Sequence, residues 1–592
     1  MSHTFRQKTK HLNFEKEQKE NDPGRSKPGH LSCAEKNYGN HIAQAYERRC
    51  VMAYRLKTNT SSRTGMQSSS RFWNSHSSVS VKDRTLEGSG IPLDFREGKV
   101  ALSAPENHCM ICAASGKGKT RRVLYPAVVM SAKAGRSIVI ADMKGEIYRN
   151  TSEEVRHCGH EIVVINLRDP EKSDRFSPLS LVQRYWNNGD HSRATILLKD
   201  ICAIVTEKLH SERDKFWETA AQDAIAGFAL LLLEKGAPLT FENIHSLFNE
   251  YLKNKDDRSM YNFFFDTKAE SYKRLSTILN LEAESTLSCV VSEFNAAISS
   301  LIDQKSIRDL LSCSDIDLRG IGEKPTAVYI VCPDESASLY GIASLFVEQC
   351  YSELVAHADS RDDNRLPVKV DFILDEFGSF VGSNWPGKLT AARSRGIRFV
   401  LAIQAMSQLV ARYDDSGART IMSNCRTLIF MGGRDMRLLS EISMLSGTRK
   451  EEKSSNERPV LSINDLSTLS MGEVVVLDDS GLPYIGHLPD WTEWKISRGT
   501  VRWRNARTEE KTADAVSLRE LLNPSENTSQ NDAPEMTFPV EKSEQRDMMI
   551  QYFIHKLDSD PEFEEQLQRI MEEKLKPEER TVEIYDDDEF PF

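Results

Sequence analysis

Eight short apolar runs constrain the fold more than any other feature of this sequence. Runs of four to six apolar residues are typical of strands buried on both faces of a parallel sheet. Segments of helical character separate most of them, which predicts an α/β fold with helical crossovers. The eight predicted strands are Cys109–Ala113, Ser137–Ala141, Glu161–Ile165, Ala327–Cys332, Val370–Leu374, Phe399–Ile403, Thr427–Met431 and Val474–Leu477.

One gap in this series is too long for a single crossover. Between Leu181 and about Ser312 the sequence is almost continuously helical in character, as in Arg193–Leu209 and Phe216–Glu234. We therefore expect an all-α domain, residues 182–315, inserted between two parts of one α/β domain, residues 89–181 and 316–490.

The two ends of the chain differ from this middle part. Residues 1–88 are polar and rich in serine, which predicts a largely disordered arm with one helix near His41–Leu56. Residues 491–592 form an acidic tail with a predicted helix at Pro561–Lys574. From Glu526 onward there are 20 acidic and 7 basic residues, so the net charge of −11 comes from the tail. Such a tail is either a solvated solubiliser or an electrostatic arm for a basic partner.

Membrane insertion and secretion are not expected from this sequence. The longest strongly apolar stretch, Ile225–Leu233, is much shorter than the ~20 residues that a bilayer requires. The first thirty residues have no apolar signal region. We expect a cytoplasmic protein whose eleven cysteines are reduced. Cys109 and Cys112 are interpreted as small apolar residues of a buried strand.

A glycine-rich loop follows the first predicted strand and precedes a helix. Backbone N–H groups of such a loop surround phosphates, and the helix N-terminus adds its positive dipole end. Lys119 would contact the β- and γ-phosphates, and the Thr120 hydroxyl would bind Mg²⁺. Ala113 stands where the phosphate-loop consensus has its first glycine. The predicted nucleotide-binding residues are Ala114, Ser115, Gly116, Lys117, Gly118, Lys119 and Thr120.

Two carboxylates end the strand Val370–Leu374. Phosphoryl transfer needs one carboxylate to hold the hydrated metal and another to orient and activate water. Asp375 suits the metal and Glu376 suits the water. Some 255 residues separate this pair from the loop, and together the two motifs predict an enzyme that hydrolyses ATP with Mg²⁺.

Three more polar residues are candidates for the same reaction. Gln404 follows the strand Phe399–Ile403, where RecA-like motors place a sensor of the γ-phosphate. Arg393 is a candidate arginine finger for the nucleotide of a neighbouring subunit, where a guanidinium offsets transition-state charge. Arg395 is a close competitor for that role.

Taken together, these motifs resemble the type IV secretion coupling proteins, the TraG/TraD-like ATPases of conjugation. The resemblance covers about Gly90 to Pro489. It also rests on six other stretches: Asp142–Glu146, Phe176–Leu179 with Ser177 in place of the usual asparagine, Lys215–Ala221, Ala391–Gln408, Ser423–Cys425 and Gly432–Gly433.

The resemblance implies a RecA-like P-loop NTPase that assembles as a hexamer, with an all-α domain that contacts the DNA-processing complex. It implies single-stranded DNA bound to a relaxase as cargo, with protein substrates as a further class. The channel ATPases of the secretion system would be further partners. Family members usually carry an N-terminal transmembrane pair. We expect a separate membrane partner to recruit this protein to the inner face of the cell membrane, and a monomer when it is alone.

Two other functions fit parts of the sequence. An FtsK-like cytosolic DNA translocase would share the motor core but not the long helical insertion. A non-catalytic adaptor that recruits cargo is suggested only by Ala113 and the missing anchor. Retention of Lys119, Thr120, Asp375 and Glu376 argues against the adaptor.

Overall fold

A computed structural model describes residues 66–522, apart from 84, 87–88, 208–214, 254–257, 259–260, 263–264, 282, 334–338, 383, 451–456, 480, 495, 497–502 and 504–513. The helices predicted at His41–Leu56 and Pro561–Lys574 lie outside the described residues.

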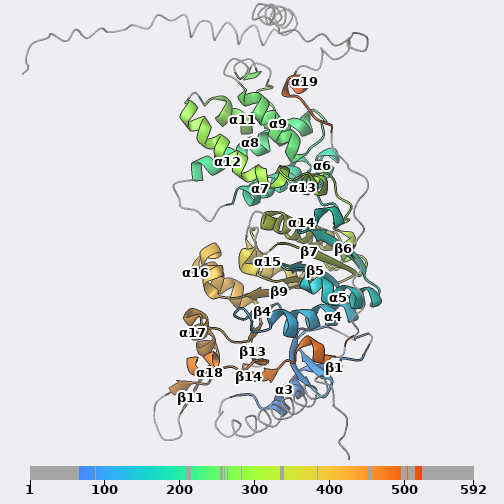
Figure 1. Ribbon diagram of the computed structural model, residues 1–592, viewed down its shortest axis with the longest axis vertical. Coiled ribbons are helices and arrows are strands. Elements are labelled where there is room, and N and C mark those ends of the chain that lie inside the picture. The colour runs from blue at the N-terminus through green and yellow to red at the C-terminus, as the bar shows by residue number, and fades with distance from the viewer. Residues whose placement is uncertain are drawn as a thin grey trace, which may run out of the picture. The chain divides into compact units, whose positions relative to one another are not determined.

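A nine-stranded sheet forms the centre of the α/β part, in the order β14-β13-β10-β4-β9-β8-β5-β7-β6 (Figure 1). All eight predicted runs are strands of this sheet, and the strands from β10 to β6 in this order run parallel. The strands are β4 (Cys109–Cys112), β5 (Ser137–Asp142), β6 (Glu161–Asn166), β7 (Thr326–Val331), β8 (Val370–Leu374), β9 (Ile397–Ile403), β10 (Thr427–Phe430), β13 (Glu473–Leu477) and β14 (Tyr484–His487).

The prediction of a parallel strand at Val474–Leu477 was wrong in direction. β13 pairs antiparallel with β10, and β14, which was not predicted, pairs antiparallel with β13. A short run of valines reads the same in either direction, so composition alone does not set the pairing. Between β10 and β13 lie α17 (Met436–Leu445), the small hairpin β11 (Thr448–Lys450) and β12 (Glu457–Pro459), and α18 (Ile463–Ser467).

Helices cover both faces of the central sheet, and alternate strand residues supply two separate cores. Cys109 and Ile111 of β4 pack with α4 (Tyr125–Lys133) and α5 (Glu146–His157). Met110 and Cys112 face the other way, toward the core that includes α14 (Tyr340–Asp359), α15 (Trp385–Ala392) and α16 (Met406–Asn424). Because Cys109 and Cys112 point to opposite faces, one metal ion cannot take both as ligands.

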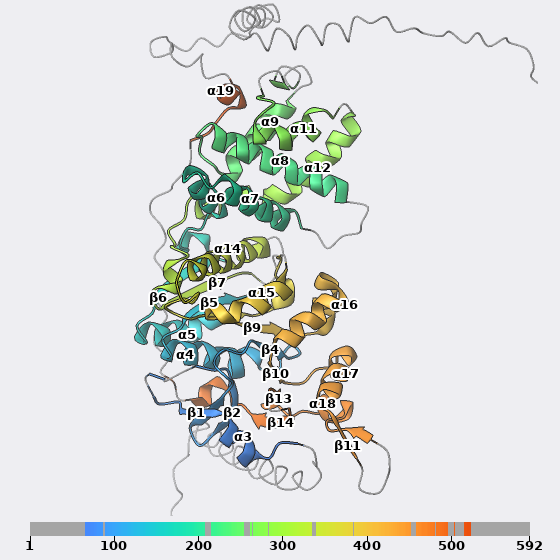
Figure 2. The ribbon, with the colours of Figure 1, turned by 180° about the vertical axis from the view of Figure 1, so that it is seen from behind.

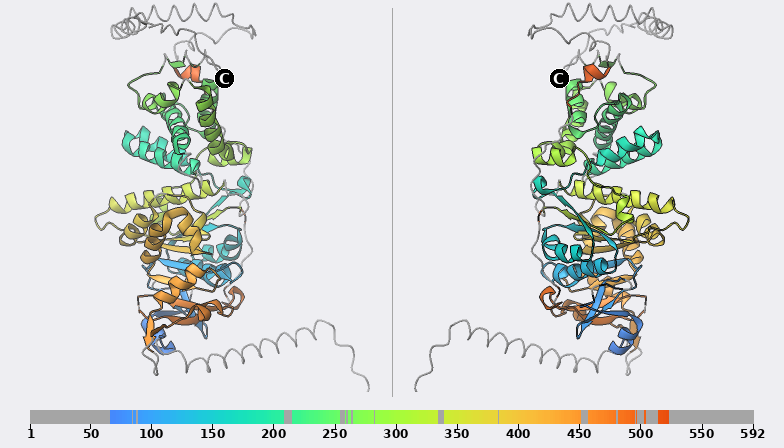
Figure 3. Two further views of the ribbon diagram at one scale, coloured as in Figure 1. Left: turned by 90° about the vertical axis from the view of Figure 1, so that its left-hand side faces the viewer. Right: turned by 90° about the vertical axis from the view of Figure 1, so that its right-hand side faces the viewer.

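The described elements between β6 and β7 are all helical, and α6 to α13 gather into one body (Figures 2 and 3). They are α6 (Pro178–Asn187), α7 (His191–Thr206), α8 (Lys215–Glu234), α9 (Phe241–Leu252), α11 (Glu270–Leu279), α12 (Glu284–Ile302) and α13 (Lys305–Leu311). We call this set the helical insertion.

Two helices of the insertion have the length and hydropathy of a membrane span: Phe216–Glu234 within α8, and α12. Of the 18-residue stretch of highest hydropathy in each helix, 67% is buried inside the protein in α8 and 33% in α12. Phe228, Leu232 and other buried residues of α8 pack at the centre of the insertion, as expected of a core helix in a globular domain.

Part of the predicted N-terminal arm is folded. Residues 69–80 form α3 (Ser69–Ser75) and β1 (Ser77–Ser80), and β1 joins β2 (Pro92–Arg96) and β3 (Lys99–Leu102) in a three-stranded antiparallel sheet. Phe72 is fully buried and stacks on Tyr484 of β14, with ring centroids 3.8 Å apart. Since that partner lies some 400 residues later, the local serine-rich composition gave no sign of it.

The predicted acidic tail likewise begins with folded residues. Trp491 and Trp494 are buried in η8 (Trp491–Trp494), and α19 (Leu518–Leu522) packs against α9 of the insertion. The Glu250 carboxylate accepts hydrogen bonds from the Leu518 and Arg519 amides, at 2.7 and 3.3 Å. The chain therefore returns from the sheet to the insertion before residue 523.

Candidate functional site

The strand order places the three predicted motifs side by side. β9 lies between β4 and β8 and runs parallel to both, so the carboxyl ends of all three strands lie at one edge of the sheet. The glycine-rich loop follows β4, Gln404 follows β9, and Asp375 and Glu376 follow β8. Ligand sites of open parallel sheets lie at this edge.

The loop from Ala114 to Thr120 has the backbone that its glycines allow. Gly116 and Gly118 adopt positive φ angles of 78° and 86°, where a side chain would cost free energy. Ala113 is buried and has no positive φ, so alanine fits the position where the consensus has glycine. The loop leads into one π-helical turn, η1 (Thr120–Leu124), and then into α4.

Residues that follow β10 and α18 hydrogen-bond to this loop from the side. The Ala114 amide donates to the Gly432 carbonyl oxygen at 3.0 Å, and Lys117 Nζ donates to the Leu469 carbonyl oxygen at 3.3 Å. Gly432 has a φ of 102°, and a Cβ there would lie 3.0 Å from the Lys117 side chain. The glycines after β10 thus allow the close approach of the two loops.

Lys119 connects the loop to both carboxylates. Its Nζ lies 2.8 Å from Asp375 Oδ1 and 2.8 Å from Glu376 Oε1, with the lysine side chain 9% exposed. Burial alone would lower the pKa of Lys119, but the charges of Asp375 and Glu376 outweigh it and raise the pKa. Burial raises the pKa of Asp375 in spite of the lysine. The ammonium therefore stays charged, in position for an anionic ligand.

Gln404 contacts the carboxylate predicted to activate water. Its side-chain Nε2 donates to Glu376 Oε1 at 2.8 Å, the same oxygen that faces Lys119. Glu376 itself adopts a positive φ of 53° two residues after the end of β8, at the start of the turn η6 (Phe377–Ser379). Four predicted residues, Lys119, Asp375, Glu376 and Gln404, thus form one contiguous polar cluster.

Asp142, at the end of β5, is a neighbour to which the sequence assigned no role. It is buried, and burial together with the nearby charge of Asp375 raises its pKa to about 6, against the backbone amides that favour its charged form. Its Oδ2 accepts from the Tyr148 amide at 2.8 Å. Its place at the end of a buried strand, as the first residue of the stretch Asp142–Glu146, was the signal that could have found it.

The two candidate arginines lie at the opposite edge of the sheet, in the turn η7 (Arg393–Arg395) just before β9. Arg395 pairs with Asp359 through two hydrogen bonds of 2.7 and 3.1 Å. Arg393 is exposed. The structure therefore does not bring Arg393 together with the cluster of its own chain.

Comparison with known proteins agrees with this arrangement. The family model described as Type IV secretory system Conjugative DNA transfer matches residues 60–476. The chain belongs to this family. Protein VirD4 of Agrobacterium fabrum (strain C58 / ATCC 33970) is 24% identical over 377 residues, which are 59% of this chain and 51% of VirD4. Protein VirD4 of Rhizobium rhizogenes is 23% identical over 370 residues. The chain thus spans about half the length of these curated relatives.

Solved structures show the same fold. The plasmid coupling protein TrwB in complex with the non-hydrolysable GTP analogue GDPNP gives a TM-score of 0.52 at 16% identity, over 72% of this chain and 92% of TrwB. TrwB in complex with ADP and Mg²⁺ gives 0.53 at 15% identity, over 75% and 95%. The RecA-like fold with an all-α domain, expected from the resemblance, is confirmed.

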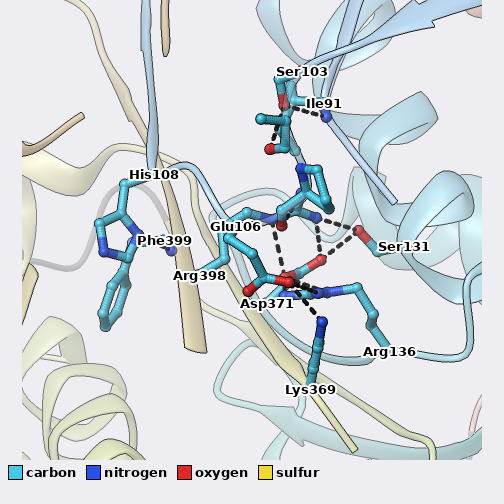
Figure 4. A network of polar contacts seen from close by, with 12 residues as sticks. Ile91, Ser103, Glu106, His108, Ser131, Arg136, Lys369, Asp371, Arg398 and Phe399 are labelled. Carbon is cyan, nitrogen blue, oxygen red and sulfur yellow. Dashed lines mark hydrogen bonds and ion pairs between the residues drawn. The ribbon is translucent and has the colours of Figure 1, made fainter. Parts of the chain in front are cut away.

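In this member of the conjugative DNA transfer family, a buried network of charged residues lies at the edge of the central sheet opposite the polar cluster (Figure 4). Asp371 of β8 accepts from Ser131 Oγ at 2.7 Å and from Arg136 Nε at 2.8 Å, and it pairs with Arg398 of β9. Asp371 and Arg398 are fully buried. Burial would raise the pKa of Asp371, but the two arginines outweigh it and lower the pKa. The network joins α4, β8 and β9.

Proposed function

We propose that the protein is an ATP-hydrolysing coupling protein that drives single-stranded DNA toward a type IV secretion channel. The single observation that carries the proposal is the contact of Lys119 Nζ with both Asp375 and Glu376 at 2.8 Å, with Gln404 on the same glutamate oxygen. A phosphate-loop lysine, a metal carboxylate and a water-activating carboxylate are the parts that ATP hydrolysis needs.

The residues suit separate steps of the reaction. Lys119 and the loop amides bind the β- and γ-phosphates and offset their charge. Glu376 orients and deprotonates the attacking water, and Gln404 holds the Glu376 carboxylate and senses the γ-phosphate. The Thr120 hydroxyl and the Asp375 carboxylate are the hard oxygen donors that Mg²⁺ prefers. When bound, Mg²⁺ would neutralise phosphate charge.

Arg393 acts on a neighbouring subunit in this proposal. It precedes β9 whereas Gln404 follows it, and seven residues of strand span about 23 Å. Arg393 therefore cannot reach its own nucleotide, while Arg395 is already paired with Asp359. A finger supplied in trans requires an oligomer, and we infer a hexameric ring as the active form.

The cargo and partners follow from the family and from the likeness to VirD4. We propose single-stranded DNA attached to a relaxase as cargo, with protein substrates as a second class. The channel ATPases of the secretion system and a membrane partner would hold the ring at the inner face of the cell membrane.

The test is phosphate release by purified full-length protein. Lys119→Ala should lower turnover by about 10²- to 10³-fold or more, because a methyl group cannot offset the phosphate charge. Glu376→Gln should lower turnover by about 10²- to 10⁴-fold and leave the affinity for an ATP analogue unchanged. Glu441→Gln, which removes only the weak surface contact with Arg419 at 3.5 Å, is the matched control. Wild-type turnover by Glu376→Gln would disprove the assignment.

The same assay separates the rival functions when DNA is added. Single-stranded DNA should raise turnover more than a duplex of equal length. Stimulation by duplex alone would indicate an FtsK-like translocase. Nucleotide binding without any turnover would indicate an adaptor.

A further inference from the structure

The first two turns of α16, residues 406–413, begin two residues after Gln404 of the polar cluster. The Gln408 Oε1 atom accepts hydrogen bonds from the backbone amides of Gln404, at 3.2 Å, and Ala405, at 3.4 Å. Since the Gln404 side chain holds Glu376, the Gln408 side chain fixes the backbone from which that contact is made. The Gln408 side chain hydrogen-bonds to backbone amides and not to the side chains that we assign to the reaction. Its role is therefore to position Gln404.

The same two turns pack on the loop that starts at Glu376. A Cβ on Gly378 would lie 2.7 Å from Gln408 Cβ, so glycine is required for this approach. The Tyr413 hydroxyl donates to the Phe380 carbonyl oxygen at 3.2 Å. Movement of α16 would therefore move both the Gln404 backbone and the loop after the Asp375–Glu376 pair.

On its other side, this segment contacts the helical insertion. Arg412 Nη1 lies 2.7 Å from Glu207 Oε1, with the two side chains 11% and 35% exposed. Glu207 caps the C-terminal end of α7. Burial raises the pKa of Glu207 in spite of the charge of Arg412. Because Arg412 is the more buried partner, separating the pair would leave its charge unpaired in a poorly solvated place, which favours one relative position of α7 and α16.

A break in α16 separates these turns from the rest of the helix. Asp414 has φ 58° and ψ −178°, a conformation that residues other than glycine rarely adopt. Its Oδ1 accepts from the Gly417 amide at 2.8 Å, which starts the helix again. Residues 406–413 are therefore a short unit with a hinge behind it, joined to the catalytic cluster on one side and to the insertion on the other.

We propose that residues 406–413, which we call the coupling segment, let the helical insertion set the rate of hydrolysis. Gln408 positions Gln404 and the Glu376 loop, and the Arg412–Glu207 pair transmits the position of α7 to them. The inference rests on the proposed ATPase function and names the contact through which the insertion would control it.

The positioning role of Gln408 is tested by removing only its acceptor atom. Gln408→Met keeps the volume and loses the acceptor, so kcat should fall about 10- to 100-fold, as expected for a catalytic group displaced by about 1 Å. The dissociation constant of a non-hydrolysable ATP analogue should stay within twofold of wild type. Gln408→Glu keeps the acceptor oxygen and should recover most of the loss in kcat. Equal kcat in Gln408→Met and wild type would overturn this role.

The coupling contact is tested with substitutions that break it from either side. Glu207→Gln and Arg412→Met should each change kcat by a similar factor, and the double variant should change it no further. Asp223→Asn, which breaks the Arg274–Asp223 pair inside the insertion, is the matched control and should leave kcat unchanged. Independent, additive effects of Glu207→Gln and Arg412→Met would overturn the proposal.

Hydrogen exchange provides a measurement that does not depend on hydrolysis. In wild type and in Asp223→Asn, binding of the ATP analogue should change amide exchange in the last turn of α7, and in Arg412→Met this change should be lost. The same change in Arg412→Met would overturn the coupling. Absence of turnover in wild type with the exchange response intact would reject the proposed ATPase function and leave the coupling standing.

Discussion

The ring of His108, the residue before β4, hydrogen-bonds to two other elements, β9 and α15. Its Nδ1 accepts from the Phe399 amide at 2.9 Å, so its Nε2 carries the proton that is donated to the Leu389 carbonyl oxygen at 2.8 Å. Burial lowers the pKa of His108 to about 4, and the charges of Arg393 and Arg398 contribute to this. The folded protein therefore holds His108 neutral at physiological pH.

This shift predicts a pH dependence of stability. The ordinary histidine pKa of 6.5 applies to the unfolded chain, which takes up a proton first as the pH falls. The contribution of His108 to the free energy of unfolding should thus decrease from about pH 6.5 to about pH 4, by up to about 3 kcal/mol. Denaturant unfolding of wild type and His108→Gln at pH 7 and 4.5 measures it. The variant should show less loss between the two pH values, and parallel losses would contradict the assignment.

Four of the catalytic candidates could be predicted because each is part of a local motif. Lys119 lies in a glycine-rich loop, and Asp375, Glu376 and Gln404 directly follow apolar strands. That they meet at one edge depends on strand order, which their own sequences do not encode. Gln408 lies in the stretch Ala391–Gln408, yet its proposed role depends on contacts with the Gln404 backbone and with the loop after β8. The same holds for Arg412, whose partner Glu207 is 205 residues earlier.

Among the elements, the strands buried on both faces were predictable and those with distant partners were not. β5, β8 and β9 are mainly apolar, with Asp371 and Arg398 each second in its strand, whereas α3 and β1 are serine-rich and gain their stability from contacts such as Phe72 with Tyr484. The direction of β13 was missed for the same reason. Pairing is decided by the connection and by neighbouring strands, and neither is visible in a run of five residues.

The network that joins α4, β8 and β9 predicts a large effect of one isosteric change. Asp371→Asn would leave Arg398 as a buried cation without a counter-ion and Arg136 with only Glu106, at 3.8 Å, so the free energy of unfolding should fall by about 3–5 kcal/mol. Asp490→Asn removes the half-exposed pair with Arg121, at 2.7 Å, and should cost about 0–1 kcal/mol. Urea unfolding followed by circular dichroism compares the two variants. Equal losses in the free energy of unfolding would show that the buried network stabilises the fold no more than the surface pair does.

For the assembled molecule, a finger in trans predicts complementation between two variants that are each impaired in turnover. Arg393→Ala should lower turnover without weakening analogue binding, because Arg393 lies at the far edge of its own sheet. Mixing it with Lys119→Ala should restore part of the activity, since some interfaces then pair an intact loop with an intact finger. Arg395→Ala, which loses the pair with Asp359, serves as the comparison. No recovery in mixtures shown to form mixed oligomers would contradict the finger.

The attachment of Leu518 and Arg519 to Glu250 has a consequence for whatever the following residues bind. The chain continues for 70 residues after Leu522, and from Glu526 onward these are strongly acidic. A ligand bound by that stretch is held on the same chain as α9. If the ligand also contacts the insertion, this second binding event is intramolecular. Weak individual affinities for a basic partner would then suffice for selective capture, and Glu250 fixes the point of the insertion from which the chain continues into this stretch.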